Sequence, residues 1–257
     1  SWTLKQSMSL SSTGNDYSGL SLVAADFEAG IGPNGINFNV IDEINKLTSK
    51  TISVWVYFTS TPDGVIFSNS NESSSVSGGW SVKIGTVSGY ISFKEYSTRE
   101  WIAGVVPTNA WTHYLITKNS TSINTAPVIY KNGVAEALTT SGTQASVPSQ
   151  IGNILTLGAK YLGGDLYSTM NGKLKDVRVY SDIKTAAEAL AIYNEGAGGT
   201  GSLNNCVFQA PAVKTQELDY FTDHTMLSTD RVLDNVYGYA GAPAKEVGGA
   251  YTIIRLP

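Results

Sequence analysis

Short runs in which apolar and polar residues alternate recur along this chain, and they constrain its fold more than any other feature. In the run TISVWVYFTS, every second residue from Ile52 to Phe58 is apolar and falls on one face of a strand. Trp55 and Tyr57 fall on the opposite face. Alternation with a period of two is the pattern of a β-strand with a buried face. Similar runs continue to about Lys175, so we expect strands through most of the chain.

The segments between these runs are rich in residues that form turns. Gly, Asn, Ser and Pro separate the runs GGWSVKIG, GYISFKEYS, NAWTHYLITKN and NILTLGAKY. The pair Asn132-Gly133 is the strongest type of two-residue hairpin signal. Many short strands joined by turns predict an antiparallel sandwich or barrel.

Composition excludes several classes of function. The 257-residue chain has a formal net charge of −4, and only 15% of its residues are charged, so it carries no basic stripe for nucleic acid. No apolar run approaches the length of about 18 residues that a membrane-spanning helix needs, so we expect no membrane insertion. The single Cys206 allows neither an intrachain disulfide nor a cysteine metal cluster. A surface rich in Gly, Ser, Thr and Asn is typical of secreted and virion proteins.

One stretch, MNGKLKDVRVYSDIKTAAEALAIYNEG from Met170 to Gly196, predicts a strand, a turn and a helix in succession. Thr185 and Glu188 have the spacing of a capping box at the start of the helix. Gly196 supplies the left-handed residue that ends it. The predicted apolar face consists of Ala186, Leu190 and Tyr193. Such a short helix needs a partner, so we expect it to pack on the sandwich.

Residues 197–257 differ in character from the rest of the chain. The segment GAGGTGSLNN is typical of a Gly-rich hinge, and the residues after it follow neither a strand nor a helix period. We therefore predict a sandwich over 1–196 and a hinge with a tail arm over 197–257. The tail could pair Tyr251 to Leu256 with an edge strand of its own sandwich, or it could reach another subunit. Its aromatic anchors for assembly are Tyr220, Phe221, Tyr237, Tyr239 and Tyr251.

The order of these motifs over about residues 5–196 resembles the laminin-G-like, concanavalin A-like jelly-roll domains. The resemblance is most specific where a Gly-x-Leu-x-Asp-Val-Arg-Val-Tyr strand leads into a short helix. The matching positions are Trp55, Trp111, His113, Tyr130, Asn132, Gly133, Gly172, Leu174, Asp176, Val177, Arg178, Tyr180, Leu190 and Tyr193. It implies an all-β, two-sheet antiparallel jelly-roll sandwich with one short C-terminal helix. The extended tail lies outside the resemblance. Within it, Asp176 and Arg178 share a strand face and are expected to pair structurally, either with each other or with turn amides.

Catalysis is not expected from the carboxylates or the histidines. The concanavalin A-like glucanases use a Glu-x-Asp-x-x-Glu motif, and the nearest approach here, Glu217 and Asp219, lacks the third carboxylate and lies in the tail. Glu95 and Glu100 have an odd spacing that points them to opposite faces of an unbroken strand. His113 lies in a strand beside Trp111 and is interpreted as a core or interface histidine. His224 has no partner Ser or Cys in a motif context. We predict that the protein is not an enzyme.

Two kinds of binding site remain open. Relatives of this family hold calcium in loops at one rim of the sandwich, and the candidate ligands here are Asp63 and Asp165, both in turns. No other cofactor is expected. Tyr96 and Trp101 flank the polar loop STRE and are candidates for stacking on a sugar ring.

The family that the chain resembles includes lectins, adhesion modules, hydrolases and virion proteins, so two functions are weighed. The first is a structural or attachment protein of a multimeric surface, a virion decoration, fibre or tail component that binds copies of itself or a capsid or tail scaffold. The alternative is a secreted carbohydrate-binding or adhesion module that binds surface glycans. Both place the protein outside the cell or on a virion surface.

Overall fold

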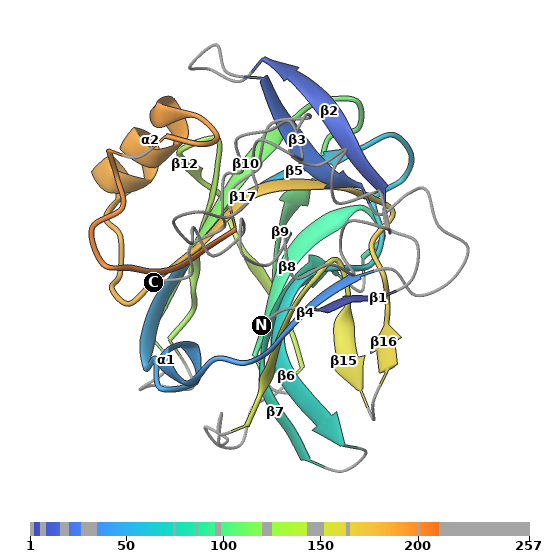
Figure 1. Cartoon of the computed structure of the whole chain (residues 1–257). Coiled ribbons are helices and arrows are strands. Elements are labelled where there is room, and N and C mark those ends of the chain that lie inside the picture. Colours follow the sequence, from blue (N-terminus) through green and yellow to red (C-terminus); the bar gives the residue numbers. More distant parts are fainter. Residues whose placement is uncertain are drawn as a thin grey trace, which may run out of the picture.

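Two antiparallel sheets face each other in the computed structural model of this chain (Figure 1). The structure describes residues 3–5, 9–15, 21–26, 35–73, 76–85, 87–95, 99–119, 125–142, 152–162, 165–199 and 201–210. Before residue 35 it describes the backbone of the strands only. The two-sheet jelly-roll sandwich that the sequence predicts is confirmed.

The first sheet has eight strands among the described residues, in the order β1–β4–β14–β6–β7–β8–β9–β13. Their bounds are Thr3–Lys5 (β1), Gly35–Val40 (β4), Ile154–Leu157 (β14), Val65–Ser73 (β6), Val76–Ile84 (β7), Tyr90–Glu95 (β8), Arg99–Val105 (β9) and Thr139–Ser141 (β13). Every neighbouring pair is antiparallel.

The second sheet has the strand order β12–β11–β10–β5–β17–β3–β2. An additional strand, β18, also pairs with β17. The bounds are Val134–Ala135 (β12), Val128–Lys131 (β11), Thr112–Asn119 (β10), Ser49–Phe58 (β5), Gly172–Tyr180 (β17), Ser21–Asp26 (β3), Ser9–Asn15 (β2) and Cys206–Ala210 (β18). The Asn132-Gly133 turn joins β11 to β12 with positive φ angles of 50° and 78°, which confirms the predicted hairpin. A separate hairpin of Lys160–Leu162 (β15) and Asp165–Tyr167 (β16) lies beside the first sheet (Figure 1).

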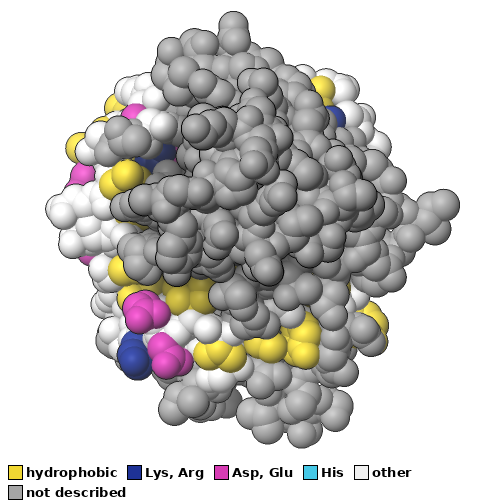
Figure 2. Space-filling view, viewed as in Figure 1, with side chains coloured by type: hydrophobic (Ala, Val, Ile, Leu, Met, Phe, Trp, Pro, Cys, Tyr) yellow, Lys and Arg dark blue, Asp and Glu magenta, His cyan; other side chains and the backbone are white. Residues whose placement is uncertain are grey.

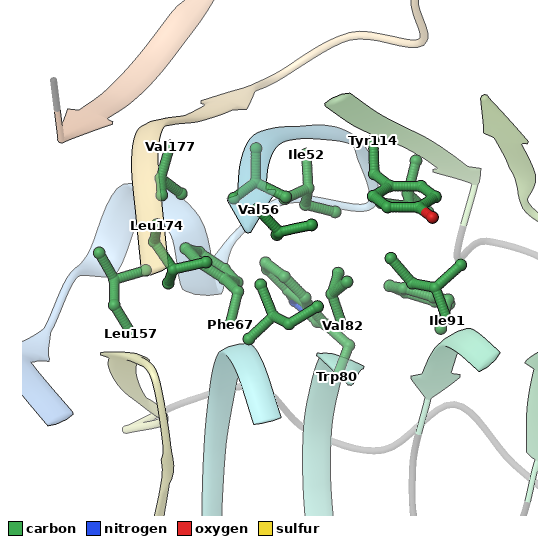
Figure 3. Packing of buried hydrophobic residues seen from close by; sticks show 14 of the residues in the cluster. Ile52, Val56, Phe67, Trp80, Val82, Ile91, Tyr114, Leu157, Leu174 and Val177 are labelled. Atoms are coloured by element: carbon green, nitrogen blue, oxygen red, sulfur yellow. The ribbon is translucent and has the colours of Figure 1, made fainter. Parts of the chain in front are cut away.

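The main core lies between the sheets (Figure 3). Ile52 and Val56 of β5 face Phe67, Trp80 and Val82 of β6 and β7, and the stacked rings of Phe67 and Trp80 have centroids 5.1 Å apart. All five side chains are at most 2% exposed. Because burying one such side chain contributes about 1.5–3 kcal/mol, this interface is the main source of stability. The inward face predicted for alternate residues from Ile52 to Phe58 of β5 is confirmed.

The predicted helix forms as Ala186–Glu195 (α2), and its ends are as the sequence predicts. Thr185 and Glu188 complete the capping box, and Gly196 has a φ of 78°. The predicted buried face is wrong for Ala186 and Leu190, which are exposed, whereas Tyr193 packs against Trp55. The buried residues of the helix are Ala189 and Ile192. They pack with Leu115, Tyr130 and Tyr180 on the outer surface of the second sheet. Leu190, 44% exposed, instead covers the backbone of Gly133 in the β11–β12 turn.

A second helix, which the sequence analysis did not predict, is the single turn Asp42–Asn45 (α1). One turn is too short to show a helical period. Ile44 is buried, whereas acidic and basic side chains gather on the exposed side of this region in Figure 2. The amide of Asn45 accepts a hydrogen bond from Asn69 at 3.0 Å and donates one to the carbonyl of Asn153 at 3.1 Å, which ties the turn to the first sheet.

The sandwich continues past the predicted boundary at residue 196. β18 pairs with β17, and Phe208 is 1% exposed in the main core, where its ring meets Phe38 edge-on at 5.1 Å. The Gly-rich segment before it is held by Arg178, which donates to the carbonyl of Gly199 at 2.6 Å. Residues up to Ala210 therefore belong to the sandwich, and an arm can begin only after them. None of the helices in the described part is long and apolar enough to cross a membrane.

Candidate functional site

A polar pocket of about 290 Å³ lies on the outer surface of the first sheet. Ser81 and Lys83 reach it because they alternate along β7 with residues that face the core. Lys94 of the neighbouring β8 and Lys160 of β15 complete its cationic side. The whole set, called here the lysine pocket, is Asp63, Gly64, Val65, Ser81, Lys83, Ile84, Gly85, Lys94, Lys160 and Ser168.

Backbone contacts at the start of β6 shape one wall of the lysine pocket. Val65 donates to the carbonyl of Ser168 at 2.8 Å, and Ile84 donates to the carbonyl of Gly64 at 2.9 Å. Gly64 has a φ of 91°, and a Cβ there would lie 2.2 Å from the carbonyl oxygen of Thr169. Only glycine tolerates both the positive φ and the close approach of the Thr169 carbonyl oxygen, so this wall depends on Gly64.

The charge that lines the lysine pocket is predominantly positive. Three lysines face one carboxylate, Asp63, among the described lining residues. Lys83 also lies 3.4 Å from Glu100, whose carboxylate accepts a hydrogen bond from Ser92 at 2.6 Å and is 6% exposed. Asp63 accepts a hydrogen bond from the Gly64 amide at 2.7 Å, while its own amide donates to Asn171 at 2.9 Å. The pocket therefore suits a ligand that is rich in hydrogen-bond acceptors.

The calcium prediction fits these surroundings poorly. Asp63 stands beside Lys83, Lys94 and Lys160, and their positive charge opposes a cation. Asp165 begins β16, and its side chain lies outside the described part of the structure. No cluster of three or more His, Cys, Asp or Glu suited to a metal occurs among the described residues. Calcium binding by this pair stays a prediction.

The predicted sugar-stacking pair is not supported by the position of Trp101. Its ring is 1% exposed in the main core beside Phe93, at a centroid distance of 6.2 Å, because β9 turns this residue inward. The ring therefore offers no surface to a sugar. Tyr96 lies outside the described residues.

Beside Trp101 the sandwich buries an ionic cluster that bridges the two sheets. Glu95 of β8 lies 3.6 Å from Lys50 of β5 and 3.3 Å from Lys118 of β10. All three side chains are at most 1% exposed. Burial lowers the pKa of Lys50 to about 8, and the charge of Glu95 opposes this shift. Trp80 and Trp101 lie under the two ammonium groups, at 5.5 Å and 5.0 Å.

Glu95 and Glu100 point to opposite faces, as predicted, although they lie on the two neighbouring strands β8 and β9. Glu95 pairs with Arg99 across the β8–β9 hairpin, and Glu100 pairs with Lys94, so the two carboxylates point to opposite faces. Glu217, Asp219 and His224 lie outside the described residues, as do the five aromatic residues proposed for assembly.

His113 is a buried core residue, as predicted. It is 0% exposed, and its Nε2 lies 2.8 Å from the hydroxyl of Ser53. Its ring packs against Trp55 and Tyr193, with centroids 5.1 Å and 6.0 Å away. Burial, with a smaller contribution from the charge of Arg178, lowers the pKa of His113 to about 3. The imidazole is therefore neutral near pH 7.

Two partly exposed aromatic side chains form a surface on the outer side of the second sheet. Tyr57 and Trp111 are partly exposed, with ring centroids 5.5 Å apart. The ammonium of Lys175 lies 4.4 Å from the centroid of the Trp111 ring. This cation occupies the space over the ring, so the surface is less open to a sugar than two bare rings would be.

Comparison with known proteins places the fold in a family. The family model described as the concanavalin A-like lectin/glucanases superfamily matches residues 33–189. The chain belongs to this superfamily. The match covers more than half of the chain and ends inside α2. No curated protein sequence shows significant similarity.

Several solved structures resemble this superfamily member in fold. The CBM40 of the Ruminococcus gnavus IT-sialidase, bound to α2,3-sialyllactose, is 16% identical, with a TM-score of 0.49 over 63% of this chain and 94% of that one. Domain 4 of AbnA, a GH43 extracellular arabinanase from Geobacillus stearothermophilus in complex with arabinotriose, is 15% identical, with a TM-score of 0.43 over 72% and 87%. The heptameric SAP-like pentraxin of Limulus polyphemus is 14% identical, with a TM-score of 0.40 over 57% and 70%. At these identities the likeness concerns the fold alone.

Sequence reasoning did not find the lysine pocket. Lys83, Lys94 and Lys160 belong to three strands, and each has the sequence context of an ordinary solvent-facing residue in an alternating run. The register of β7 against β8 could have placed Lys83 and Lys94 on one face. The position of the β15–β16 hairpin has no comparable signal.

Proposed function

We propose that this protein is a non-catalytic carbohydrate-binding module and that the lysine pocket is its binding site. The observation that carries the proposal is a polar, donor-rich pocket on the surface of a lectin/glucanase-type sandwich. The hydroxyl groups of Ser81 and Ser168 and the three ammonium groups are suited to the hydroxyl and ring oxygens of a saccharide. The proposed function implies an extracellular location, where polysaccharides are found.

The arrangement of the carboxylates around the pocket supports a binding function rather than hydrolysis. Glycosidases need two carboxylates about 5–9.5 Å apart on either side of the bond that is cleaved. Asp63 is the carboxylate among the described lining residues, and its Oδ1 is engaged by the Gly64 amide. The nearby Glu100 is paired with Lys83 and Ser92. Both carboxylates therefore already accept hydrogen bonds from the protein.

A glycan array probed with the whole chain tests this proposal. Ser81→Trp fills the lysine pocket from the outer side of β7, whereas Val134→Trp adds the same side chain to β12, at a site that is 66% exposed. We expect the wild-type chain and Val134→Trp to bind the same saccharides, and Ser81→Trp to lose them. Unchanged binding by Ser81→Trp, or release of sugar from a bound oligosaccharide, contradicts the proposal.

The assembly role proposed for the tail is a separate prediction with its own test. Since β18 completes the sandwich, an informative deletion removes residues 211–257 and keeps everything up to Ala210. If the tail is an assembly arm, the truncated protein stays folded and its mass in light scattering falls to that of a monomer. An unchanged oligomeric mass excludes the arm, and with it the interpretation as a virion decoration, fibre or tail component.

A further inference from the structure

The sign of the charge in the lysine pocket is opposite to that of the whole chain. The chain has a net charge of −4, yet the described lining of the pocket has three lysines and one aspartate, with Glu100 next to Lys83 and Lys94. A concave site lined by one sign of charge concentrates the field inside it and attracts ligands of the opposite sign. The local field at this site therefore favours an anion.

The lysines come together through the register of the sheet. Ser81 of β7 is paired with Lys94 of β8, and Lys83 is paired with Ser92, so Lys83 and Lys94 are diagonal neighbours on the same face. Side chains in this relation lie within reach of each other, and like charges placed so close repel. Glu100 offsets part of this repulsion at Lys83. Lys160 enters from a different hairpin and adds a third positive charge to the same pocket.

The remaining polar groups of the lysine pocket are compatible with an anionic ligand. The carboxylate of Asp63 turns back on the amide of its own neighbour, Gly64, at 2.7 Å. The hydroxyl groups of Ser81 and Ser168 add donors beside the ammonium groups. A pocket of about 290 Å³ is near the lower end of small-molecule sites, which suits one charged sugar residue better than a long chain.

We propose that the lysine pocket selects acidic saccharides and binds the carboxylate or sulfate group of a single sugar residue. This inference rests on the proposed carbohydrate-binding function and narrows it to one class of ligand. Lys83 and Lys94 hold the anion from β7 and β8, and Lys160 adds a third ammonium group from the β15–β16 hairpin. The serine hydroxyl groups contact the neutral part of the sugar.

The test uses an array on which each acidic saccharide has an uncharged counterpart. Oligogalacturonides are printed beside their methyl esters, and sulfated oligosaccharides beside their desulfated forms. The proteins are the wild-type chain, Lys94→Gln, Lys160→Gln and the charge-conserving Lys94→Arg. The control is Lys46→Gln, which removes one exposed lysine at the end of α1, outside the pocket. Inorganic sulfate alone is titrated in parallel.

We expect the acidic members to bind and their uncharged counterparts to fail. Each Lys→Gln change in the pocket should weaken binding about tenfold, the loss of one charge-assisted hydrogen bond, while Lys94→Arg retains most of the affinity. Lys46→Gln should bind like the wild type, and raising the salt concentration should weaken binding.

Other outcomes separate this inference from the proposed function. Equal binding of the uncharged counterparts, lost in Ser81→Trp, overturns the acidic selectivity and leaves the carbohydrate-binding function standing. Binding of inorganic sulfate as tight as that of any saccharide overturns recognition of a sugar. No binding to any member of the array overturns both.

Discussion

Arg178 and Asp176, two residues apart on β17, form a buried two-point ion pair. The Nε and one terminal nitrogen of Arg178 donate to the two carboxylate oxygens of Asp176 at 2.9 Å and 2.7 Å. Residues two apart on a strand point to the same face. The register of β17 against β5 shifts between Lys175 and Arg178, and Asp176 adopts a φ of 49° there. The same carboxylate accepts from the Gly198 amide at 2.9 Å, and Arg178 also lies 3.6 Å from Glu195 at the end of α2. The pair therefore holds helix α2 and the glycine-rich segment onto the sheet.

The first prediction concerns this pair. Asp176→Asn keeps a residue type that tolerates a positive φ but leaves the Arg178 charge buried without its carboxylate. We expect a loss of about 3–5 kcal/mol in the free energy of unfolding, measured by urea denaturation. Glu43→Gln, at an exposed position of α1, serves as the control and should change little. A loss below about 1 kcal/mol for Asp176→Asn would show that the buried pair contributes no more to stability than a surface salt bridge does.

The second prediction concerns the ionic cluster between the sheets. Glu95→Gln leaves Lys50 and Lys118 buried together without a counter-charge, so we expect a loss of about 3–5 kcal/mol in unfolding free energy. The triple change Lys50→Met, Glu95→Leu and Lys118→Met removes all three charges and should restore stability to near that of the wild type. If the triple variant is as unstable as Glu95→Gln, the cluster contributes through packing and not through its charge balance.

The third prediction is a pH dependence that arises from His113. Its pKa is about 3 in the folded protein, against an ordinary value of 6.5, so between these pH values only the unfolded chain binds the proton. Lowering the pH through this window therefore favours unfolding, at a rate of at most about 1.4 kcal/mol per pH unit. His113→Gln keeps a group that can hydrogen-bond to Ser53 and does not titrate.

Urea denaturation at several pH values between about 7 and 4 measures this effect. The free energy of unfolding should fall more steeply for the wild type than for His113→Gln, because the carboxylates contribute equally to both. Parallel curves for the two proteins would mean that His113 is protonated in the folded state and that its burial does not govern the acid sensitivity.

The fourth prediction concerns the wall of the lysine pocket. In Gly64→Ala, the new Cβ would sit on a residue with positive φ and lie 2.2 Å from the carbonyl oxygen of Thr169. The substitution should therefore lower the unfolding free energy by more than about 1 kcal/mol. It should also weaken saccharide binding. Gly89→Ala is the matched control, since Gly89 has a φ of 79° but no atom within 4 Å of the position that a Cβ would take. Equal losses of unfolding free energy for the two variants would show that the backbone around Thr169 relaxes without an energetic cost.

Local patterns in the sequence predict the parts of this fold that depend on neighbouring residues. The Asn132-Gly133 turn, the Thr185–Glu188 capping box and the pairing of Asp176 with Arg178 each involve residues at most three apart, and all are confirmed. The alternation along β5 likewise gives the correct core face.

Features that depend on distant segments are not predicted. The buried side of α2 is set by where Leu115 and Tyr180 lie on the sheet, so the apolar residues of the helix alone give the wrong face. Trp101 has the sequence context of a sugar platform, but the pairing of β8 with β9 turns it into the core. The lysine pocket needs β7, β8 and β15 together, and the strand β18 follows a glycine-rich segment that resembles a hinge.

Backbone amide chemical shifts of the whole chain, followed during a titration with an oligogalacturonide, map where a saccharide binds. We expect the shift changes to concentrate at residues 63–65, 81–85 and 94, around the lysine pocket. Lys94→Gln should reduce them at equal ligand concentration, while Lys46→Gln should not. Shift changes concentrated instead at Tyr57 and Trp111 on the second sheet, or absent throughout for every acidic saccharide, would contradict binding of acidic saccharides in the lysine pocket.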